Sequence, residues 1–256
     1  MREMLKTLNL SIAVLKMFTK EKPTWGGREL ALEMNINHTN LYRILETFEN
    51  NGFITKDPTT KKYSLGIALW EIGMNMYDSL NIDQLCLPIL EKLKDTTGET
   101  AVFTVLNGLE ALTLLKAEPV NKVKFSVSQG SRTPLYVGAS YRSMLAYLNE
   151  EQISQVIDVP LMAYTNNTLT NASKIRAELE VIRECGYATS NSEYTADVLA
   201  LAMPVFNSEE QVVASVTVSG PTYRFTEQRI AEVLQPLMEA KHEIEDIIRK
   251  YHLNFS

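Results

Sequence analysis

The sequence predicts an α+β protein of two domains: a small helical N-terminal domain that ends in a β-hairpin, and a larger C-terminal domain of strands and helices. Three patterns carry this prediction. Apolar residues recur at helical spacing in residues 37–50, two β-prone runs flank a turn at residues 57–60, and strand-like and helical segments follow one another from residue 100 onward. With 256 residues, the chain is long enough for two domains and a substantial core.

The first predicted helix covers residues 4–18. Four apolar side chains on it are spaced three or four residues apart, which places them on one side of a helix. They are Leu5, Leu8, Ile12 and Leu15. We expect this side to pack against the two helices that follow.

Those two helices are predicted at residues 27–34 and 37–50, separated by a polar turn at residues 35–37. The second helix has one apolar stripe and one polar face. The stripe consists of Leu41, Ile44, Leu45 and Phe48, and the opposite face consists of Thr39, Arg43, Glu46 and Asn50. The apolar stripe is expected to be buried, which leaves the polar face open to a partner.

The start of the second helix suits a phosphate or a base edge. Asn37 is the expected N-cap, so His38, Thr39 and Asn40 lie in the first turn, where backbone N–H groups are free. Gly52 is the expected end of the helix, because glycine readily adopts the left-handed conformation found there.

A hairpin is predicted at residues 53–65, with an Asp-Pro-Thr-Thr turn flanked by lysines. Helix, turn, helix and basic hairpin in this order predict a winged helix-turn-helix that binds DNA through the second helix and the wing. A purely structural helix pair is the alternative. The candidate DNA-binding residues are Arg28, His38, Thr39, Asn40, Tyr42, Arg43, Lys56, Lys61 and Lys62.

Charge is distributed unevenly along the chain. Residues 1–66 contain ten basic and seven acidic residues, a net charge of +3, whereas the remainder carries −9. A locally basic end on an acidic protein favours binding of an anionic polymer by one domain. Because +3 is modest, we expect two or more copies of the domain to act on one operator.

The predicted domain boundaries are residues 1–66 for the DNA-binding domain, 67–81 for a linker helix, and 82–256 for the C-terminal domain. The linker has apolar residues on several faces, which indicates a dimer contact; burial within its own chain is the alternative. The C-terminal domain is expected to contain helices at residues 83–96, 141–148, 150–156, 172–185 and 226–251, and strands at residues 100–106, 111–117, 122–128, 198–206 and 211–219.

Several functional classes lack support in the sequence. The longest apolar runs fall short of the ~20 residues that span a bilayer, so a cytoplasmic protein without membrane contact is expected. Cys86 and Cys185 are expected to be reduced and buried. No metal-ligand spacing, phosphate-binding loop or nucleophile elbow is present, so we predict no catalytic residue, metal or cofactor. An enzyme of dispersed catalytic residues remains an alternative.

The chain resembles the IclR family of bacterial transcription regulators over essentially its whole length. The resemblance rests on the order and spacing of residues 40–53, Tyr63-Ser64-Leu65-Gly66, Thr97-Gly98-Glu99-Thr100, residues 130–135, Ala202-Met203-Pro204-Val205-Phe206 and Val218-Ser219-Gly220-Pro221. It implies a winged helix-turn-helix domain, a GAF-like effector-binding domain, and assembly as a homodimer or a dimer of dimers.

The resemblance also implies a site for a small-molecule effector, by default an organic acid. Its candidate residues are Gly130, Leu135, Gly138, Ala139, Ser140, Ser190, Ala200, Thr217 and Ser219. The chain departs from the family pattern here. Tyr141-Arg142 replaces Gly-Lys, Ser190 and Ala200 replace the Asp and Cys of acid-binding members, and Thr217 replaces a serine. Tyr141 could narrow the entrance, so a poorly occupied pocket is an alternative.

Together these features predict a sequence-specific transcriptional regulator whose affinity for double-stranded operator DNA is controlled by a metabolite, with repression favoured over activation. A ligand-independent regulator with an occluded pocket is one alternative. A protein-interaction module that has lost DNA binding is another; Glu46 on the polar face repels phosphate, although it can accept a hydrogen bond from a cytosine amino group.

Overall fold

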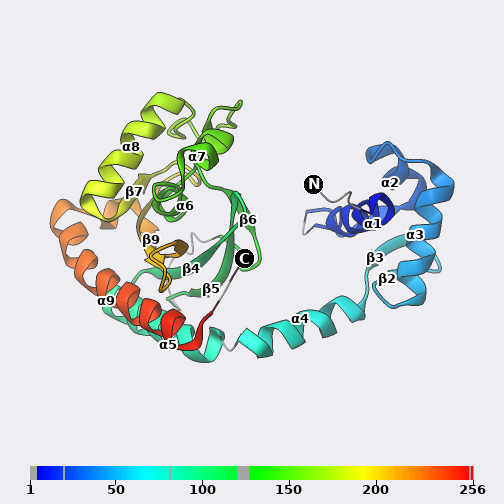
Figure 1. Ribbon diagram of the computed structural model, residues 1–256, viewed down its shortest axis with the longest axis horizontal. Helices are drawn as coiled ribbons and strands as arrows, with labels where there is room; N and C mark the ends of the chain where they lie inside the picture. Colours follow the sequence, from blue (N-terminus) through cyan, green and yellow to red (C-terminus); the bar gives the residue numbers. More distant parts are fainter. Residues whose placement is uncertain (1–4, 20, 81, 120–126, 254, 256) are drawn as a thin grey trace. The chain divides into compact units, whose positions relative to one another are not determined.

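The computed structural model describes residues 5–19, 21–80, 82–119, 127–253 and 255. The chain forms two compact units, Met1–Leu80 and Asn81–Ser256, which Figure 1 shows with their helices and strands labelled. The two units are described separately below.

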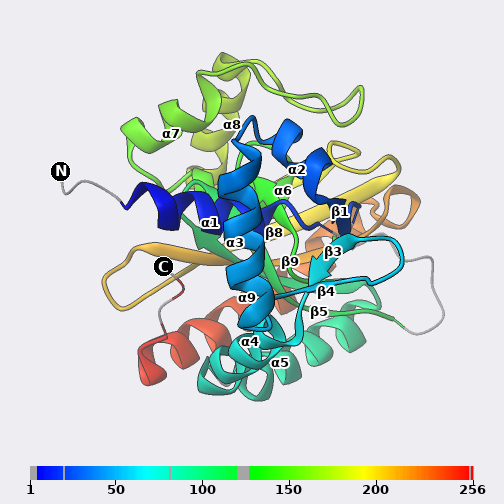
Figure 2. The same cartoon turned by 90° about the vertical axis from the view of Figure 1, so that its right-hand side faces the viewer.

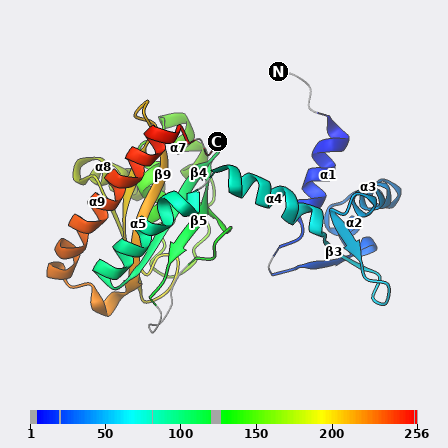
Figure 3. The same ribbon diagram turned by 90° about the horizontal axis from the view of Figure 1, so that it is seen from below.

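The N-terminal unit contains the predicted helices and hairpin, together with a third strand. Its helices are α1 (Lys6–Lys16), α2 (Gly27–Glu33), α3 (His38–Asn50) and α4 (Ile67–Leu80), and its strands are β1 (Thr24–Gly26), β2 (Ile54–Lys56) and β3 (Lys62–Leu65). The strands form an antiparallel sheet in the order β1-β3-β2. Strand β1 was not predicted; it places Trp25 opposite Tyr63, and both side chains are buried. Figure 3 shows β3 leading into α4.

The predicted packing side of α1 is wrong for three of its four residues. Leu5, Leu8 and Ile12 are 73%, 56% and 45% exposed, whereas Leu15 is partly buried against the core of the unit, in which Val14 and Phe18 lie. Apolar residues of this helix form two stripes of helical period, and periodicity alone does not say which of them faces the core. The stripe that includes Val14 packs into the core, so most of the other stripe of the helix is in contact with solvent.

The C-terminal unit is built on one antiparallel sheet of six strands in the order β6-β5-β4-β9-β8-β7. Its strands are β4 (Thr100–Asn107), β5 (Glu110–Ala117), β6 (Arg132–Pro134), β7 (Ala188–Asn191), β8 (Val198–Phe206) and β9 (Val212–Pro221). The predicted strands at residues 100–106, 111–117, 198–206 and 211–219 agree with β4, β5, β8 and β9. The short edge strands β6 and β7 were not predicted. Of the remaining predicted strand, residues 122–128, residues 122–126 lie outside the described residues, and residues 127 and 128 are not in a strand.

Helices cover both faces of this sheet (Figure 2). Helices α5 (Ile82–Thr97) and α9 (Glu227–Tyr251) pack together on one face, while α6 (Ala139–Leu145), α7 (Glu150–Ile157) and α8 (Ala172–Cys185) lie on the other. A single turn of 3₁₀ helix, Thr222–Arg224, precedes α9. Thr226 caps α9, because its side chain accepts a hydrogen bond from the Arg229 N–H.

Both cysteines have free thiols, and the prediction of burial holds for one of them. Cys86 is buried in α5, and burial raises its pKa to about 12. Cys185 is exposed, because it is the last residue of α8 and lies beyond the buried stripe of that helix. In the described residues, no helix is long and apolar enough to cross a membrane.

Candidate functional site

The start of α3 has the geometry expected of a recognition helix. The Asn37 side chain accepts a hydrogen bond from the Thr39 N–H at 2.8 Å, which confirms Asn37 as the N-cap. Gly52, just after the helix, has a φ of +72°, the left-handed conformation predicted for it. Leu41, Ile44 and Leu45 are buried under the helix. This burial fixes which face of α3 remains available.

The available face is polar and accessible. The sequence-predicted residues His38, Thr39, Asn40, Tyr42 and Arg43 are all exposed, and so is Arg28 on α2. Glu46 and Asn50, also predicted to face outward, are exposed as well.

Tyr42 and Arg43 have different surroundings. The Tyr42 ring, on α3, lies against Gly27, the first residue of α2, and so joins the two helices. Arg43 has no carboxylate partner among the described residues, and its guanidinium is therefore free to bind an external acceptor.

The wing is a tight, preorganised hairpin. The Asp57 carboxylate accepts hydrogen bonds from the N–H groups of Thr59 and Thr60, at 2.8 and 2.6 Å, and these bonds lower the pKa of Asp57. Lys61 closes the turn with a φ of +59°, and its N–H donates to the Asp57 carbonyl. The turn is thus held by the backbone and by Asp57, which leaves the lysine side chains uninvolved in its structure.

The lysines of the wing are available in different degrees. Lys61 and Lys62 are exposed and have no carboxylate partner in the described part of the chain. Lys56 lies over the ring of Tyr63, with its Nζ 5.1 Å from the ring centre. By contrast, Lys22 near α2 is neutralised by Glu29 at 2.7 Å. Lys61 and Lys62, at the tip of the hairpin, are therefore cations of this unit that can bind an external anion.

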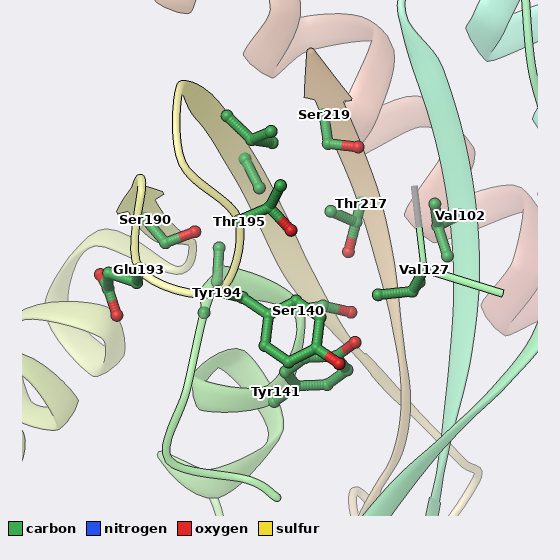
Figure 4. Close-up of a pocket in the computed structure, with 14 residues that line it drawn as sticks. Val102, Val127, Ser140, Tyr141, Ser190, Glu193, Tyr194, Thr195, Thr217 and Ser219 are labelled. Atoms are coloured by element: carbon green, nitrogen blue, oxygen red, sulfur yellow. The ribbon is translucent and has the colours of Figure 1, made fainter. Parts of the chain in front are cut away.

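The C-terminal unit contains a cavity of about 80 Å³ between α6 and the sheet, partly open to solvent. Figure 4 shows its lining, which comes from α6, strands β4, β7, β8 and β9, and the loop after β7. Strand register explains this convergence: Ser190 of β7 is opposite Ala200 of β8, which is opposite Ser219 of β9. Three neighbouring strands thus contribute one small residue each to the same row.

Seven of the nine candidate effector residues line this cavity: Gly138, Ala139, Ser140, Ser190, Ala200, Thr217 and Ser219. The other two are not among the lining residues. Gly130 lies in an exposed turn before β6, and Leu135 is fully buried in the hydrophobic core. Both help to shape the segment that leads to α6, but their side-chain positions do not face the cavity.

Several lining residues were not predicted from the sequence: Val102, Val127, Glu193, Tyr194, Thr195 and Val198. Val102 could have been found, because it lies opposite Thr217 in the sheet and hence on the same face. The loop residues Glu193, Tyr194 and Thr195 follow β7, a strand that was itself not predicted.

A buried ion pair supports the wall of the cavity. Arg142 of α6 is fully buried and hydrogen-bonds both carboxylate oxygens of Glu193, one of them at 2.7 Å. Arg142 also donates to the Thr189 carbonyl at 3.0 Å. The Thr168 hydroxyl donates to the Glu193 carbonyl, and the Thr165 hydroxyl donates to the neighbouring Ser192 carbonyl, both at 2.6 Å. The loop after β7 is therefore fixed over the cavity, and the charge of Glu193 is neutralised within the protein.

The cavity offers hydrogen-bonding groups without an unpaired charge on the described lining. Ser190, Thr217 and Ser219 are at least nine-tenths buried, yet their hydroxyls face the cavity. Gly138 caps α6 with a φ of +88°, and the N–H groups of Ala139 and Ser140 at the helix start precede the first intrahelical bond. Hydroxyls and N–H groups around a small, partly open cavity suit a small polar molecule. The described residues include no cluster of three or more His, Cys, Asp or Glu placed to hold a metal ion.

These features define a class of protein: a winged helix-turn-helix unit with an exposed polar face on α3, followed by a mixed α+β unit with a GAF-like sheet and a cavity lined by hydroxyl groups. Comparison with family models agrees. Residues 11–58 match the IclR helix-turn-helix domain, and residues 74–246 match the C-terminal domain of bacterial transcriptional regulators of the IclR type. The chain belongs to the IclR family and is a DNA-binding transcriptional regulator, as the resemblance and the predicted fold class indicated.

Individual relatives cover nearly the whole chain. It is 31% identical over 240 residues to the HTH-type transcriptional regulator KipR of Bacillus subtilis, covering 93% of this chain and 95% of the relative. It is 24% identical to the transcriptional repressor IclR of Escherichia coli, covering 93% and 88%. Among solved structures, the IclR transcriptional regulator of Alicyclobacillus acidocaldarius superposes with a TM-score of 0.84 at 28% identity, covering 95% and 99%.

Proposed function

We propose that this protein binds a specific operator through α3 and the wing, and that a small metabolite bound in the cavity of the C-terminal unit controls its affinity for that operator. The observation that carries the proposal is the exposed polar face of α3, where Arg43 is unpaired, beside the free lysines of the hairpin. Repression is favoured over activation, since a relative covering most of the chain is a transcriptional repressor.

The proposed division of roles follows the chemistry of each residue. Thr39, Asn40 and Arg43 would meet base edges, because side chains at the start of a recognition helix reach the major groove. Lys56, Lys61 and Lys62 of the wing, with Arg28, His38 and Tyr42, would contact phosphates and sugars, which positions the helix without reading sequence.

The protein is proposed to act as a homodimer or a dimer of dimers. Ile67, Trp70 and Ile72 of α4 are each more than half exposed, and α1 leaves a second apolar stripe uncovered. Apolar patches of this kind mark contacts with another copy or another protein. Two copies would also supply the phosphate contacts that a unit of charge +3 lacks on its own.

The proposed effector is a small organic acid or a similarly sized polar molecule. Gly138, Ala139 and Ser140 offer backbone N–H groups to an anionic or carbonyl oxygen, while Ser190, Thr217 and Ser219 offer hydroxyls from the sheet. Ala200 leaves room between them. A ligand changes DNA affinity only if it binds differently to two arrangements of the assembly, and α4 is the segment through which such a difference would act.

No enzymatic activity is proposed. Most side chains that line the cavity are apolar or carry a hydroxyl group. The carboxylate on this lining, Glu193, is already bound by Arg142. A regulator of bacterial operators works where the DNA is, so we place this protein in the cytoplasm.

The proposal is tested by selection from random-sequence DNA with the full-length protein. We expect enrichment of an inverted repeat whose halves lie one or two helical turns apart, each turn being ~34 Å. Fluorescence anisotropy on the enriched site, with and without a panel of metabolic acids and sugars, then tests ligand control. Failure to enrich any sequence would contradict operator binding, whereas enrichment without a ligand effect would favour a ligand-independent regulator.

A further inference from the structure

Two aromatic side chains, Tyr194 and Tyr141, lie at one end of the cavity (Figure 4), and the more deeply buried of them is Tyr141. It is the third residue of α6 and only 4% exposed. Figure 4 shows its ring at the end of the cavity away from Ser219. Tyr141 was expected to narrow the entrance of the cavity, but its buried ring bounds the cavity from inside. The residue nearer to solvent is the exposed Thr195, in the loop after β7.

The ring lies between Gly138 and two threonines. On one side, a Cβ at Gly138 would be 3.7 Å from the Tyr141 Cδ2. On the other side, the Tyr141 hydroxyl lies near Thr133 and Thr113, whose own hydroxyls are buried and have no hydrogen-bond partner among the described residues. Burial raises the pKa of Tyr141 to about 12, so the phenol is neutral near pH 7.

A second polar region lies behind the ring. Thr113 of β5 and Thr133 at the centre of β6 are both 1% exposed, and neither lines the cavity. Removal of the Tyr141 ring would join this region to the cavity and provide it with two hydroxyls at its far end. The side chain at position 141 thus sets how far a ligand can extend beyond Ser140 and Thr217.

We infer that Tyr141 is the residue that limits ligand length in this protein, so that the cavity accepts compact polar molecules and rejects longer ones of the same chemistry. This inference rests on the proposed function in that it assigns ligand binding to the same cavity. It concerns size selection by the ring, not the identity of the polar head group.

The test uses full-length protein and three series of probes from three to eight carbons: linear alkanols, linear monocarboxylic acids and α,ω-diols. Thermal shift and calorimetry give the affinity of each probe. For the wild type we expect affinity to rise roughly fourfold per added methylene and then to fall at a length limit, since each buried methylene contributes ~0.8 kcal/mol. In Tyr141→Ala the limit should move upward by at least two carbons, and long diols should bind better than alkanols of equal length because Thr113 and Thr133 become accessible.

Two control variants separate the ring from general loosening. Tyr141→Phe keeps the ring and should keep the wild-type limit. Tyr147→Ala removes the same atoms from a tyrosine that packs on Phe206 and does not line the cavity, so its limit should also be unchanged. If Tyr141→Ala fails to fold, Tyr141→Leu provides a smaller increase in length.

An unchanged limit in the Tyr141 variants, or an equal change in Tyr147→Ala, would overturn the inference. The proposed function has a separate readout, the anisotropy of operator DNA. A shifted limit without any effect of ligands on DNA affinity would leave the size selection standing and remove ligand control. Absence of binding by every probe to every variant would contradict both.

Discussion

The two units of this protein use arginine in opposite ways. Arg43 lies on the exposed face of α3 and has no carboxylate partner among the described residues, whereas Arg142 is fully buried and bound to Glu193. An unpaired, hydrated cation is available to an external phosphate or base. A buried and neutralised cation is not, and it contributes instead to holding a loop over a cavity. The same residue type thus indicates recognition in one unit and structure in the other.

The largest effect on stability is expected when the buried pair of Arg142 and Glu193 is broken. Arg142→Met leaves the Glu193 carboxylate buried without its partner, which costs about 3 to 5 kcal/mol in the free energy of unfolding. Urea denaturation followed by near-UV circular dichroism measures the loss. Arg176→Met is the control, because Arg176 binds Glu150 and Asp158 near the surface and its removal should change little. Similar losses of stability in Arg142→Met and Arg176→Met would contradict the view that burial makes the loss of Arg142 costly.

The second effect concerns alkaline pH. The pKa of Tyr141 is raised from 10.0 to about 12 by burial, so its contribution to stability is complete below pH 10 and is lost as the pH rises toward 12. Tyr141→Phe should lack this loss, so between pH 10 and 12 its free energy of unfolding should fall by roughly 3 kcal/mol less than that of the wild type. Unfolding between pH 8 and 12 measures it. The free energy of unfolding of this variant should still fall somewhat with pH, because the pKa of Cys86 is also raised to about 12.

The third effect tests the exposed arginine. Arg43→Ala should weaken binding to the selected operator by roughly 1 to 3 kcal/mol, the usual contribution of a base-reading arginine, while binding to random DNA changes less. Anisotropy titrations on both DNAs give the ratio. An equal loss on both would reassign Arg43 to a phosphate contact.

The fourth effect compares one N-cap in each unit. Asn37→Ala and Asn149→Ala each remove a side-chain acceptor at a helix start and should each cost about 1 kcal/mol. The two tryptophans, Trp25 and Trp70, both belong to the N-terminal unit, so their fluorescence reports on that unit. We expect Asn37→Ala to shift the fluorescence transition and weaken DNA binding, and Asn149→Ala to do neither. Coupled changes would show that the two units unfold together.

The smallest effect is expected at the wing. Lys61→Ala removes one exposed cation without altering the hydrogen bonds of Asp57 that hold the turn. Affinity should fall alike on all DNA sequences, and the slope of log affinity against log salt should flatten by about one unit. An unchanged slope would place the wing outside the DNA interface.

The N-terminal unit was the more predictable one because its elements are local. The N-cap at Asn37, the stripe through Leu41 and Leu45, and the left-handed Gly52 each depend on neighbours within one or two turns. What sequence could not decide was the choice between two equally periodic stripes on α1, which depends on α2 and α3. Strand β1 was missed for a similar reason, since three residues become a strand only when β3 pairs with them.

The cavity was less predictable because it depends on long-range register. Ser190, Ala200 and Ser219 were identified through the family resemblance, but their adjacency arises from the pairing of β7, β8 and β9. Periodicity in one segment gives no such information. Glu193 was missed because its position depends on Arg142, about fifty residues earlier in the chain.

Gly66, between the wing and α4, has a mechanical consequence. A Cβ at this position would collide with the Gly52 carbonyl, so the chain passes there in direct backbone contact. The Gly66 N–H donates to the Phe53 carbonyl at 2.8 Å, and the Ala68 N–H donates to the Gly52 carbonyl at 3.1 Å. The first turn of α4 is therefore clamped to the end of α3. The fourteen residues of α4 make a helix about 21 Å long, so any rotation of its first turn must be shared by the backbone that follows α3.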